Sequence, residues 1–360
     1  MTIREFLELA TREKASDLFI VAGRPLTFKK NGELELADQE RVMPKEAEKL
    51  VREIYELAGN RDMEKFLQTG DDDFSFAIPG LSRFRVSTYF QRGSMSAVIR
   101  VITFQLPEPS SLGIPQNIIK LGDCSKGLVL VTGPAGSGKS TTLACVIDYI
   151  NSNREGHIIT LEDPLEYLHR HKKSIVSQRE ISSDTESYVS ALRASLRQAP
   201  DVILLGEMRD YETIQIAMTA AETGHLVFST LHTIGAANTI DRIIDVFPAN
   251  QQRQIAVQLA SVLQAVVSQQ LVPAMDGRMV PAFEIMTTTP AIRNMIRENK
   301  VHQIDGLIYS SAGEKMVSMD SSLLALYQQG IIEEKEALRY ASNPEMLKRK
   351  CNCSEPGKIS

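Results

Sequence analysis

The stretch Leu128-Val-Leu-Val-Thr-Gly133-Pro-Ala-Gly-Ser-Gly138-Lys-Ser140 decides the fold of this chain. Its first four residues are an apolar run that predicts a buried strand, and the residues from Thr141 to Ile150 predict a helix. The spacing Gly-x-x-x-x-Gly-Lys-Ser between a strand and a helix is typical of a phosphate-binding loop. The stretch therefore predicts a strand–loop–helix unit that binds the phosphates of a nucleotide.

Each residue type in this loop has a chemical reason. Glycines allow the backbone to turn successive N–H groups toward phosphate oxygens, and the start of the helix adds its positive end. We expect Lys139 to reach the β- and γ-phosphates and the Ser140 hydroxyl to ligate Mg²⁺, so ATP and Mg²⁺ are the expected cofactors. The residues expected to hold the nucleotide are Gly133, Pro134, Ala135, Gly136, Ser137, Gly138, Lys139, Ser140 and Thr141.

The composition limits the possible folds and partners. With 360 residues the chain is long enough for two domains, and its 43% hydrophobic content is ordinary for a soluble globular protein. A net charge of −5 gives no signature of nucleic-acid binding. The N-terminus lacks the layout of a signal peptide, and no apolar run approaches the roughly 20 residues of a membrane span. We therefore expect a soluble, cytoplasmic protein.

The four cysteines fit a reducing compartment. Cys124 and Cys145 lie in apolar or helical surroundings and are interpreted as reduced thiols. Cys351 and Cys353 form a Cys-x-Cys pair in a polar tail with no second pair of ligands nearby. For that tail the sequence favours disorder over metal binding.

Residues 1–104 are predicted to form a small α+β domain. Helical periodicity at 2–14 and an apolar pattern at 44–57 predict two helices, and short strands lie around and after them. Asn31-Gly32 is a turn signal between two extended segments. A Pro- and Ser-rich stretch then indicates a linker, which we place at 105–116.

The remainder, 117–360, is predicted to be an α/β domain, because short apolar strands alternate with helical segments. Near-continuous apolar strands suit a parallel sheet that is covered on both faces. The strands are expected at 127–132, 157–161, 201–205 and 225–230. Helices are expected at 250–271 and at 291–299, and the second of these belongs to a C-terminal helical region of about 290–350.

Acidic residues stand at the ends of two of these strands. Glu162 and Asp163 follow one strand, and Glu207 follows another. Because ligands bind at the carboxyl ends of strands in open α/β sheets, both groups are expected beside the nucleotide. Such acids can instead be solvated or cap a helix, but two of them beside an intact loop favour a hydrolytic site that organises Mg²⁺ and the attacking water.

Two of the six histidines bracket one strand, His225 before it and His232 after it. A histidine near the γ-phosphate could sense that group, since the ring both donates and accepts hydrogen bonds. The residues alone leave a structural role open for both.

Taken together, these segments resemble the secretion ATPases, and more closely the PilT-type retraction ATPases of bacterial type IV pili, over nearly the whole chain. Glu162 to Tyr167 is similar to the family's Asp box, Gly206 to Asp210 to its Walker B region, and Thr223 to Thr233 to its His box. Ala291 to Glu298 resembles the AIRNLIRE motif of retraction motors, with Met295 for Leu.

Three features modify the resemblance. Ala135 stands where the family usually has Thr, and Ala199 where Asp is common. Many pilus assembly motors carry a four-cysteine zinc site after the phosphate loop, whereas this chain has no cysteine between Cys145 and Cys351. The sequence therefore favours a retraction motor over an assembly motor.

The resemblance implies a homohexamer whose subunits each have an N-terminal PAS-like domain and a C-terminal RecA-like domain. It implies that a neighbouring domain supplies arginines to the phosphates, and Arg85 and Arg100 match those positions. Glu162 would orient or deprotonate the attacking water, Glu207 would act on Mg²⁺ directly or through water, and both histidines would sense the γ-phosphate. The division of labour between Glu162 and Glu207 stays open.

The implied function is ATP hydrolysis that powers pilus retraction and twitching motility. The implied partners are an inner-membrane platform protein and a paralogous retraction ATPase, at the cytoplasmic base of the pilus. Two other classes were weighed. A low-turnover, nucleotide-regulated accessory subunit is disfavoured by the intact Glu162 and Glu207. A DNA motor is disfavoured by the net acidity and by the lack of an aromatic-basic stripe.

Overall fold

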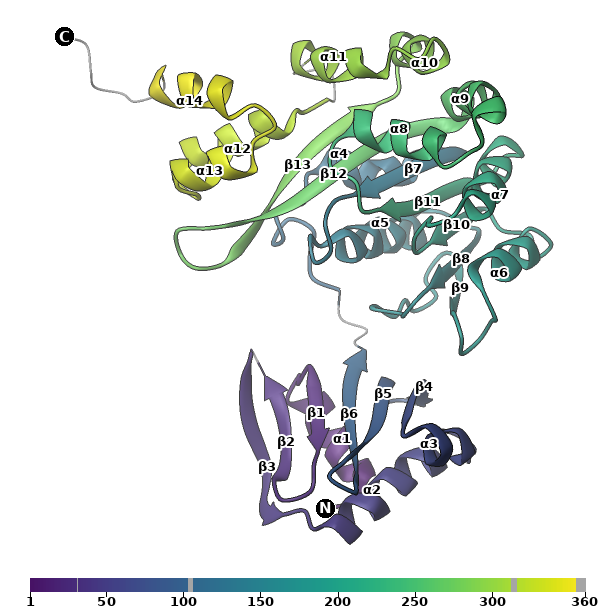
Figure 1. The fold of residues 1–360 in the computed structure, drawn as a ribbon, viewed down its shortest axis with the longest axis vertical. Helices are drawn as coiled ribbons and strands as arrows, with labels where there is room; N and C mark the ends of the chain where they lie inside the picture. Colours follow the sequence, from purple (N-terminus) through teal and green to yellow (C-terminus); the bar gives the residue numbers. More distant parts are fainter. Residues whose placement is uncertain (31, 103–105, 312–315, 354–360) are drawn as a thin grey trace. The chain divides into compact units, whose positions relative to one another are not determined.

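The computed structural model describes residues 1–30, 32–102, 106–311 and 316–353. The chain forms two compact units, each with its own sheet and apolar core (Figure 1). The first unit comprises Met1–Gln105 with Leu165–Leu168, and the second comprises Leu106–Pro164 with His169–Ser360. Within the described residues no helix is long and apolar enough to cross a membrane.

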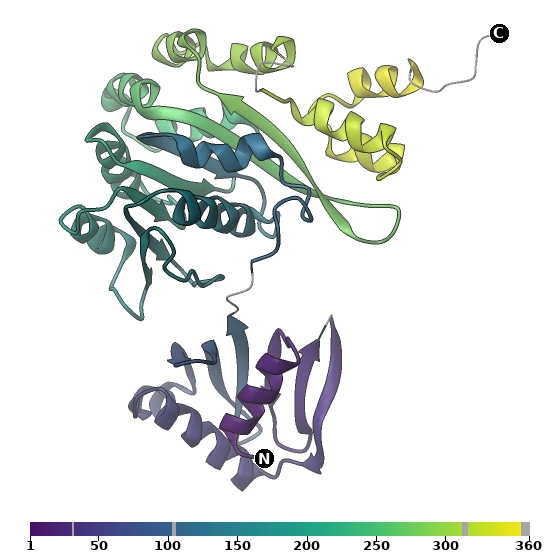
Figure 2. The ribbon, with the colours of Figure 1, turned by 180° about the vertical axis from the view of Figure 1, so that it is seen from behind.

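The first unit is built on an antiparallel sheet in the order β3-β2-β1-β6-β5-β4. Helices α1 and α2 lie along one face of this sheet (Figure 2). Its strands are β1 (Asp17–Ile20), β2 (Pro25–Lys30), β3 (Glu33–Arg41), β4 (Asp71–Ile78), β5 (Ser82–Gln91) and β6 (Ser94–Ile102). Its helices are α1 (Ile3–Arg12), α2 (Pro44–Leu57) and α3 (Glu64–Thr69).

The two helices predicted in this unit are confirmed. In α1 the Thr2 side chain accepts a hydrogen bond from the Glu5 backbone, and the Glu5 carboxylate accepts one from the Thr2 backbone. This capping box satisfies two backbone donors at the start of the helix. The apolar residues at helical spacing are buried, as the periodicity predicts. Of the predicted turn at Asn31-Gly32, Asn31 lies outside the described residues.

The second unit is built on a sheet in the order β13-β12-β7-β11-β10-β8-β9, parallel except for the edge strand β13. The strands are β7 (Gly127–Thr132), β8 (His157–Glu162), β9 (Ile175–Glu180), β10 (Val202–Leu205), β11 (Leu226–Leu231), β12 (Leu263–Pro273) and β13 (Met279–Thr287). The four predicted strands correspond to β7, β8, β10 and β11, and the α/β fold class is confirmed.

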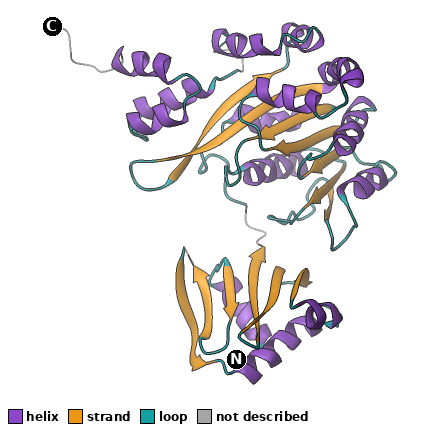
Figure 3. Ribbon diagram, in the orientation of Figure 1, coloured by secondary structure: helices purple, strands orange, loops and turns teal. Residues whose placement is uncertain are grey.

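Helices cover both faces of this sheet (Figure 3). The helices of this unit are α4 (Gln116–Ile119), α5 (Lys139–Asn153), α6 (Tyr188–Ser195), α7 (Tyr211–Glu222), α8 (Ala236–Asp245), α9 (Ala249–Val262), α10 (Pro290–Arg297), α11 (Ile304–Ser310), α12 (Met319–Gln328), α13 (Glu334–Tyr340) and α14 (Pro344–Cys353). Two short 3-10 helices, η1 (Lys120–Asp123) and η2 (Val301–Gln303), complete the unit.

Alternate residues of β7 face two different apolar cores. Leu128 and Leu130 belong to the core formed with α6 to α9, whereas Val129 and Val131 belong to the core formed with α4 and α5. A strand in the middle of a parallel sheet must be apolar on both faces, which is why the run 128–131 contains no polar residue. This double burial fixes the point from which the phosphate loop leaves the sheet.

The predicted helix at 250–271 is wrong in its second half. Helix α9 ends at Val262 and the chain continues directly into strand β12. Short buried apolar runs do not distinguish helix from strand by periodicity, and this one fills the gap between β7 and β13.

The predicted disorder of the polar C-terminal tail is also wrong as far as the structure describes it. Helix α14 extends to Cys353, and Cys351 is buried in a small apolar cluster with Leu347 and Ala337. No group of three or more potential metal ligands occurs among the described residues.

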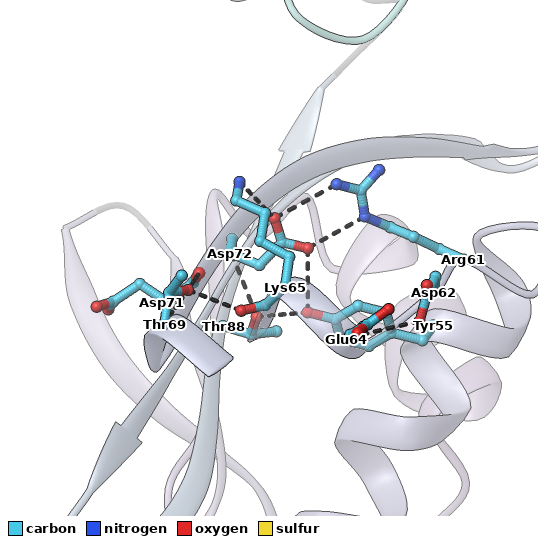
Figure 4. Close-up of polar contacts among 9 residues, drawn as sticks. All are labelled: Tyr55, Arg61, Asp62, Glu64, Lys65, Thr69, Asp71, Asp72 and Thr88. Carbon is cyan, nitrogen blue, oxygen red and sulfur yellow. Dashed lines mark hydrogen bonds and ion pairs between the residues drawn. The ribbon is translucent and has the colours of Figure 1, made fainter. Parts of the chain in front are cut away.

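The first unit contains a buried polar cluster centred on Asp72 of β4 (Figure 4). Its carboxylate accepts hydrogen bonds from Arg61 Nε at 3.1 Å, Lys65 Nζ at 3.0 Å and Tyr55 Oη at 3.2 Å. The Tyr55 oxygen also lies 2.9 Å from the Thr88 hydroxyl of β5. The cluster therefore joins α2, α3 and their connection to the sheet through a side chain that is inaccessible to solvent.

Burial by itself would raise the pKa of Asp72, but hydrogen bonds and charges from Arg61 and Lys65 outweigh it and hold the pKa below its ordinary value. The folded state thus prefers the ionised carboxylate. Because the folded-state pKa is lowered, this stabilisation is present above the ordinary pKa of Asp and is lost as the pH falls through the folded-state value.

We predict that Asp72→Asn weakens the first unit by roughly 2–3 kcal/mol, since hydrogen bonds to a charged group are lost and two cations remain without their anion. The readout is hydrogen exchange of the backbone amides of β4, which should lose protection in the variant. Asp73→Asn is the matched control, because Asp73 lies exposed on the opposite face of the same strand. Equal protection in both variants would contradict the prediction.

Candidate active site

The phosphate loop leaves β7 at Gly133 and enters α5 at Lys139. Three of its glycines have positive φ angles, 139° at Gly133, 74° at Gly136 and 87° at Gly138. A Cβ atom on Gly133 would overlap the carbonyl oxygen of Gln269 in β12. The loop can therefore lie this close to the neighbouring strand only with glycine at that position.

The loop directs donor groups inward. The Lys139 side chain is buried, and its Nζ donates to the carbonyl oxygens of Gly133 and Pro134, each at 2.9 Å. The Ser137 hydroxyl is also buried and, among the described residues, has no hydrogen-bond partner. An anion such as a phosphate supplies the acceptor oxygens that suit this donor set.

Gln269 of β12 contacts the loop and the helix that follows it, a contact that no sequence pattern indicates. The Thr142 hydroxyl of α5 donates to Gln269 Oε1 at 2.8 Å, and both residues are buried. Gln269 Nε2 lies 2.8 Å from the place that a Cβ would take on Gly138. Sequence analysis missed this residue because the segment was assigned to a helix and lies far from the loop along the chain.

The acidic residues predicted at strand ends lie on one edge of the sheet. Glu162 is the last residue of β8, and Glu207 follows the neighbouring strand β10 by two residues. The Gly206 backbone donates to the Leu161 carbonyl at 2.8 Å, so the ends of the two strands remain in register. Because β7 ends at the same edge, the structure brings both acids to the side of the sheet where the phosphate loop begins.

Glu207 is held by two cationic or polar partners. One carboxylate oxygen forms an ion pair with Arg209, and the other lies 3.3 Å from His232 Nε2. Burial alone would raise the pKa of Glu207, but the hydrogen bond and charge of Arg209, followed by those of His232, lower it below its ordinary value. The carboxylate therefore stays ionised. Arg209 lies within the stretch that resembles the Walker B region, but the sequence did not predict it as a site residue.

The two histidines do not share a site. His232 follows β11 and reaches Glu207, whereas His225 precedes β11 and its Nδ1 lies 2.9 Å from the Ala220 carbonyl. Seven residue steps at about 3.3 Å each place their Cα atoms roughly 23 Å apart. His225 therefore lies at the opposite edge of the sheet from this chain's own loop, and its role as a phosphate sensor stays a prediction.

Arg85 and Arg100 lie directly opposite each other on β5 and β6 of the first unit. Asp17 of β1 is the partner of Arg100 on its other side, and the Arg100 Nε donates to Asp17 Oδ1 at 3.0 Å. Arg100 is largely exposed and Arg85 is partly buried. The structure thus collects two of the predicted site residues on one face of the smaller sheet.

In the second unit, two pockets lie beside the phosphate loop and Glu207. One, of about 560 Å³, is lined by Glu207, Arg209, His232 and Arg242 among others. The other, of about 650 Å³, lies beside Gly138 and Thr141 of the loop. Its walls are largely apolar, and they include Leu112, Ile114, Leu271, Val280, Pro281 and Ile331. A pocket of this kind beside a phosphate loop was not foreseen from the sequence.

Comparisons with known proteins agree with this geometry. The model of the type II/IV secretion system protein family matches residues 1–303. The type IV pilus retraction ATPase PilT of Pseudomonas aeruginosa is 44% identical over 345 residues, covering 96% of this chain and 99% of the relative. A twitching motility protein of Neisseria gonorrhoeae is 45% identical over 302 residues, covering 84% and 81%.

A solved structure gives the same picture. The crystal structure of the pilus retraction motor PilT with bound ADP matches with a TM-score of 0.88 and 44% identity, over 97% of this chain and 99% of that chain.

We predict that Thr142→Val loosens the loop and weakens ADP binding, because it leaves a buried Gln269 oxygen without its donor, at a cost of about 1–3 kcal/mol. The double variant Thr142→Val, Gln269→Leu removes both polar groups and should recover part of that stability. Hydrogen exchange of α5 and the Kd for ADP measure the two effects. Thr219→Val, which removes an exposed hydroxyl from α7, is the control. A single variant as stable as the double one would contradict the interpretation.

Proposed function

The chain belongs to the type II/IV secretion system protein family, as a PilT-type ATPase, and on that premise we propose that it is the motor that powers type IV pilus retraction and twitching motility. The observation that carries the proposal is the single edge of the larger sheet on which the phosphate loop, Glu162 and Glu207 meet. A loop alone binds nucleotide; carboxylates beside it add the means to hydrolyse it. Neither acid is replaced, which argues against a low-turnover accessory subunit.

Each group has a role in this proposal. Backbone N–H groups of the loop and Lys139 Nζ bind the β- and γ-phosphates, with the Lys139 ammonium exchanging its present carbonyl acceptors for phosphate oxygens. Glu162 orients or deprotonates the attacking water. His232, in contact with Glu207, responds to the presence of the γ-phosphate. Arg209 keeps Glu207 ionised.

Mg²⁺ fits the oxygen donors at this edge, the Ser140 hydroxyl and the Glu207 carboxylate, directly or through water. Bound there, it would neutralise charge on the phosphates. The small number of protein oxygens is what a magnesium site completed by substrate phosphates requires. Kinetic comparison of Glu162→Gln with Glu207→Gln tests this assignment of the attacking water to Glu162.

The pocket beside the loop fits a nucleotide base. Its apolar walls at Leu112, Ile114 and Leu271 offer contact to a flat ring, and it opens next to Gly138 at the start of α5. The residues from Ser110 to Ile114 thus contribute to nucleotide binding in the proposal, although the sequence indicated only a linker there.

We further propose a homohexamer of subunits with a PAS-like first domain (1–104), a linker (105–116) and a RecA-like second domain (117–360). The six-stranded sheet with helices on one face and the parallel sheet with helices on both faces support these assignments. Arg85 and Arg100 are proposed to complete a neighbour's site, where guanidinium groups would offset charge on the transferred phosphoryl group. Arg85 and Arg100 lie on the same face of the smaller sheet, which supports the proposal that both contact the same phosphates.

The motor is proposed to act in the cytoplasm, at the inner-membrane base of the pilus, on a platform protein and beside a paralogous retraction ATPase. The surface proposed for the platform protein lies on α10. Ile292 and Ile296 are buried there, and Arg293 donates to the last carbonyl oxygens of α9 at Ala260 and Ser261. Asn294 and Arg297 are exposed polar residues of this helix and are available to a partner.

We predict that Lys139→Ala abolishes Mg²⁺-dependent ATP hydrolysis and pilus-dependent motility, because the loop loses the cation that binds the β- and γ-phosphates. The measurements are phosphate release by the purified oligomer and colony spreading by twitching. Lys120→Ala, on an exposed residue of η1, is the matched control and should leave both unchanged. Motility that survives Lys139→Ala would overturn the proposed function.

We predict that Arg297→Glu leaves ATP hydrolysis within about twofold of the native rate but abolishes retraction, since Arg297 is exposed on α10 and far along the chain from the hydrolytic edge. Phosphate release and twitching are measured in parallel. Ile296→Ala is the contrasting variant. It should destabilise the second unit by roughly 2–5 kcal/mol, because it opens a cavity in the core. Loss of hydrolysis equal to that of Lys139→Ala would refute the separate effector surface.

A further inference from the structure

Tyr188 occupies a special place at the start of α6. Its ring packs against the apolar core of the second unit. Its hydroxyl oxygen lies 2.7 Å from the position that a Cβ would occupy on Gly206. Glycine at 206 therefore leaves the space that the hydroxyl fills. Phenylalanine would fill the core equally well, so the packing does not account for the oxygen.

Gly206 links the ends of strands β8 and β10, where Glu162 and Glu207 lie. Its amide donates to the Leu161 carbonyl, and its own carbonyl accepts a hydrogen bond from the Thr230 hydroxyl at 2.6 Å. The Cβ position of Gly206 also lies 3.4 Å from the Cα of Glu162. Since Glu207 is the next residue, the Tyr188 hydroxyl lies against the backbone that carries one acid and adjoins the other.

The charged groups around this hydroxyl lie at or just after the ends of strands β8 and β10. The carboxylate cluster, defined as Glu162, Asp163 and Glu207, lies at the ends of β8 and β10. Burial raises the pKa of Tyr188 well above its ordinary value, and the cluster raises it further, in the order Asp163, Glu207, Glu162. Arg209 opposes this effect. The raised pKa favours the protonated hydroxyl, which is a hydrogen-bond donor.

The donor is not used within the chain. Across the part of the chain that the structure describes, no atom accepts a hydrogen bond from the Tyr188 hydroxyl. Tyr188 is partly buried, and its hydroxyl lies beside three carboxylates that are suitable acceptors for its hydrogen bond in the working state.

We propose that Tyr188 is a positioning residue of the hydrolytic site: its hydroxyl donates a hydrogen bond to the carboxylate cluster and thereby fixes the carboxylate that acts on the attacking water. This inference rests on the proposed ATPase function and deepens it. The phosphates are bound by the loop and the base by its pocket, so Tyr188 contributes to the chemical step and leaves nucleotide binding to other groups. A group with this role affects kcat while KM and the affinity for ADP stay constant.

The test is Tyr188→Phe in the full-length oligomer, which removes one oxygen and keeps the ring. Loss of a hydrogen bond to a charged group in the transition state should lower kcat by about tenfold to a hundredfold. KM for ATP and Kd for ADP should stay within about twofold. Tyr149→Phe is the matched control, because it also removes a hydroxyl that donates to a carboxylate, Asp123 at 3.0 Å, outside the carboxylate cluster. It should leave kcat unchanged.

A double-variant cycle with Gly206→Ala gives a second readout that a purely structural role would not produce. The added methyl would displace the Tyr188 hydroxyl, so Gly206→Ala should lower kcat strongly in the native background. In the Tyr188→Phe background the hydroxyl is already absent, and the same change should cost less than about threefold. The coupling is read from kcat per nucleotide-binding site, which corrects for any loss of folded protein.

The outcomes separate the inference from the function on which it rests. Native protein without ATPase activity would overturn the proposed function. Active native protein with an unchanged kcat in Tyr188→Phe would overturn this inference alone. So would additive effects of the two substitutions, or a change in KM and ADP affinity as large as the change in kcat.

Discussion

The close approach of the phosphate loop to strand β12 is the constraint on which the rest of the site depends. The backbone at Gly133 lies against the Gln269 carbonyl with no room for a side chain, and Gln269 holds α5 through Thr142. Strand β12 therefore acts as the wall of the nucleotide site as well as a member of the sheet. A glycine that tolerates a φ of 139° is what allows strand, loop and helix to turn within this space.

Parallel strand order explains why hydrolysis can occur next to that loop. Strands β7, β11, β10 and β8 are neighbours and end at one edge, so residues distant along the chain meet there. Glu162, Glu207 and His232 each lie at or just after the end of a strand, so the order of the strands brings them together. Both faces of the sheet are buried, which fixes the strands rigidly and leaves the edge as the place for polar groups. The ion pair of Arg209 with Glu207 then keeps the carboxylate charged in a partly buried setting.

Each unit contains a buried or partly buried carboxylate that neighbouring cations keep ionised. Asp72 in the first unit and Glu207 in the second both lose solvent, and burial opposes their ionised forms. Each is kept ionised by cations whose side chains reach solvent, Arg61 and Lys65 for one and Arg209 for the other. In the first unit, the ionised carboxylate links α2 and α3 to the sheet by hydrogen bonds. In the second it is a carboxylate available for chemistry.

The sequence by itself determined the local units: the loop from Gly133 to Ser140, the helices at 2–14 and 44–57, and the strands that end in acids. These follow from short-range spacing, because the period of apolar residues and the glycines of a turn act over a few positions. It did not determine strand β12, the contact of Gln269 with the loop, or the position of Tyr188. Those depend on which strands lie side by side, and strand order is decided by burial of the whole sheet, which no short segment encodes.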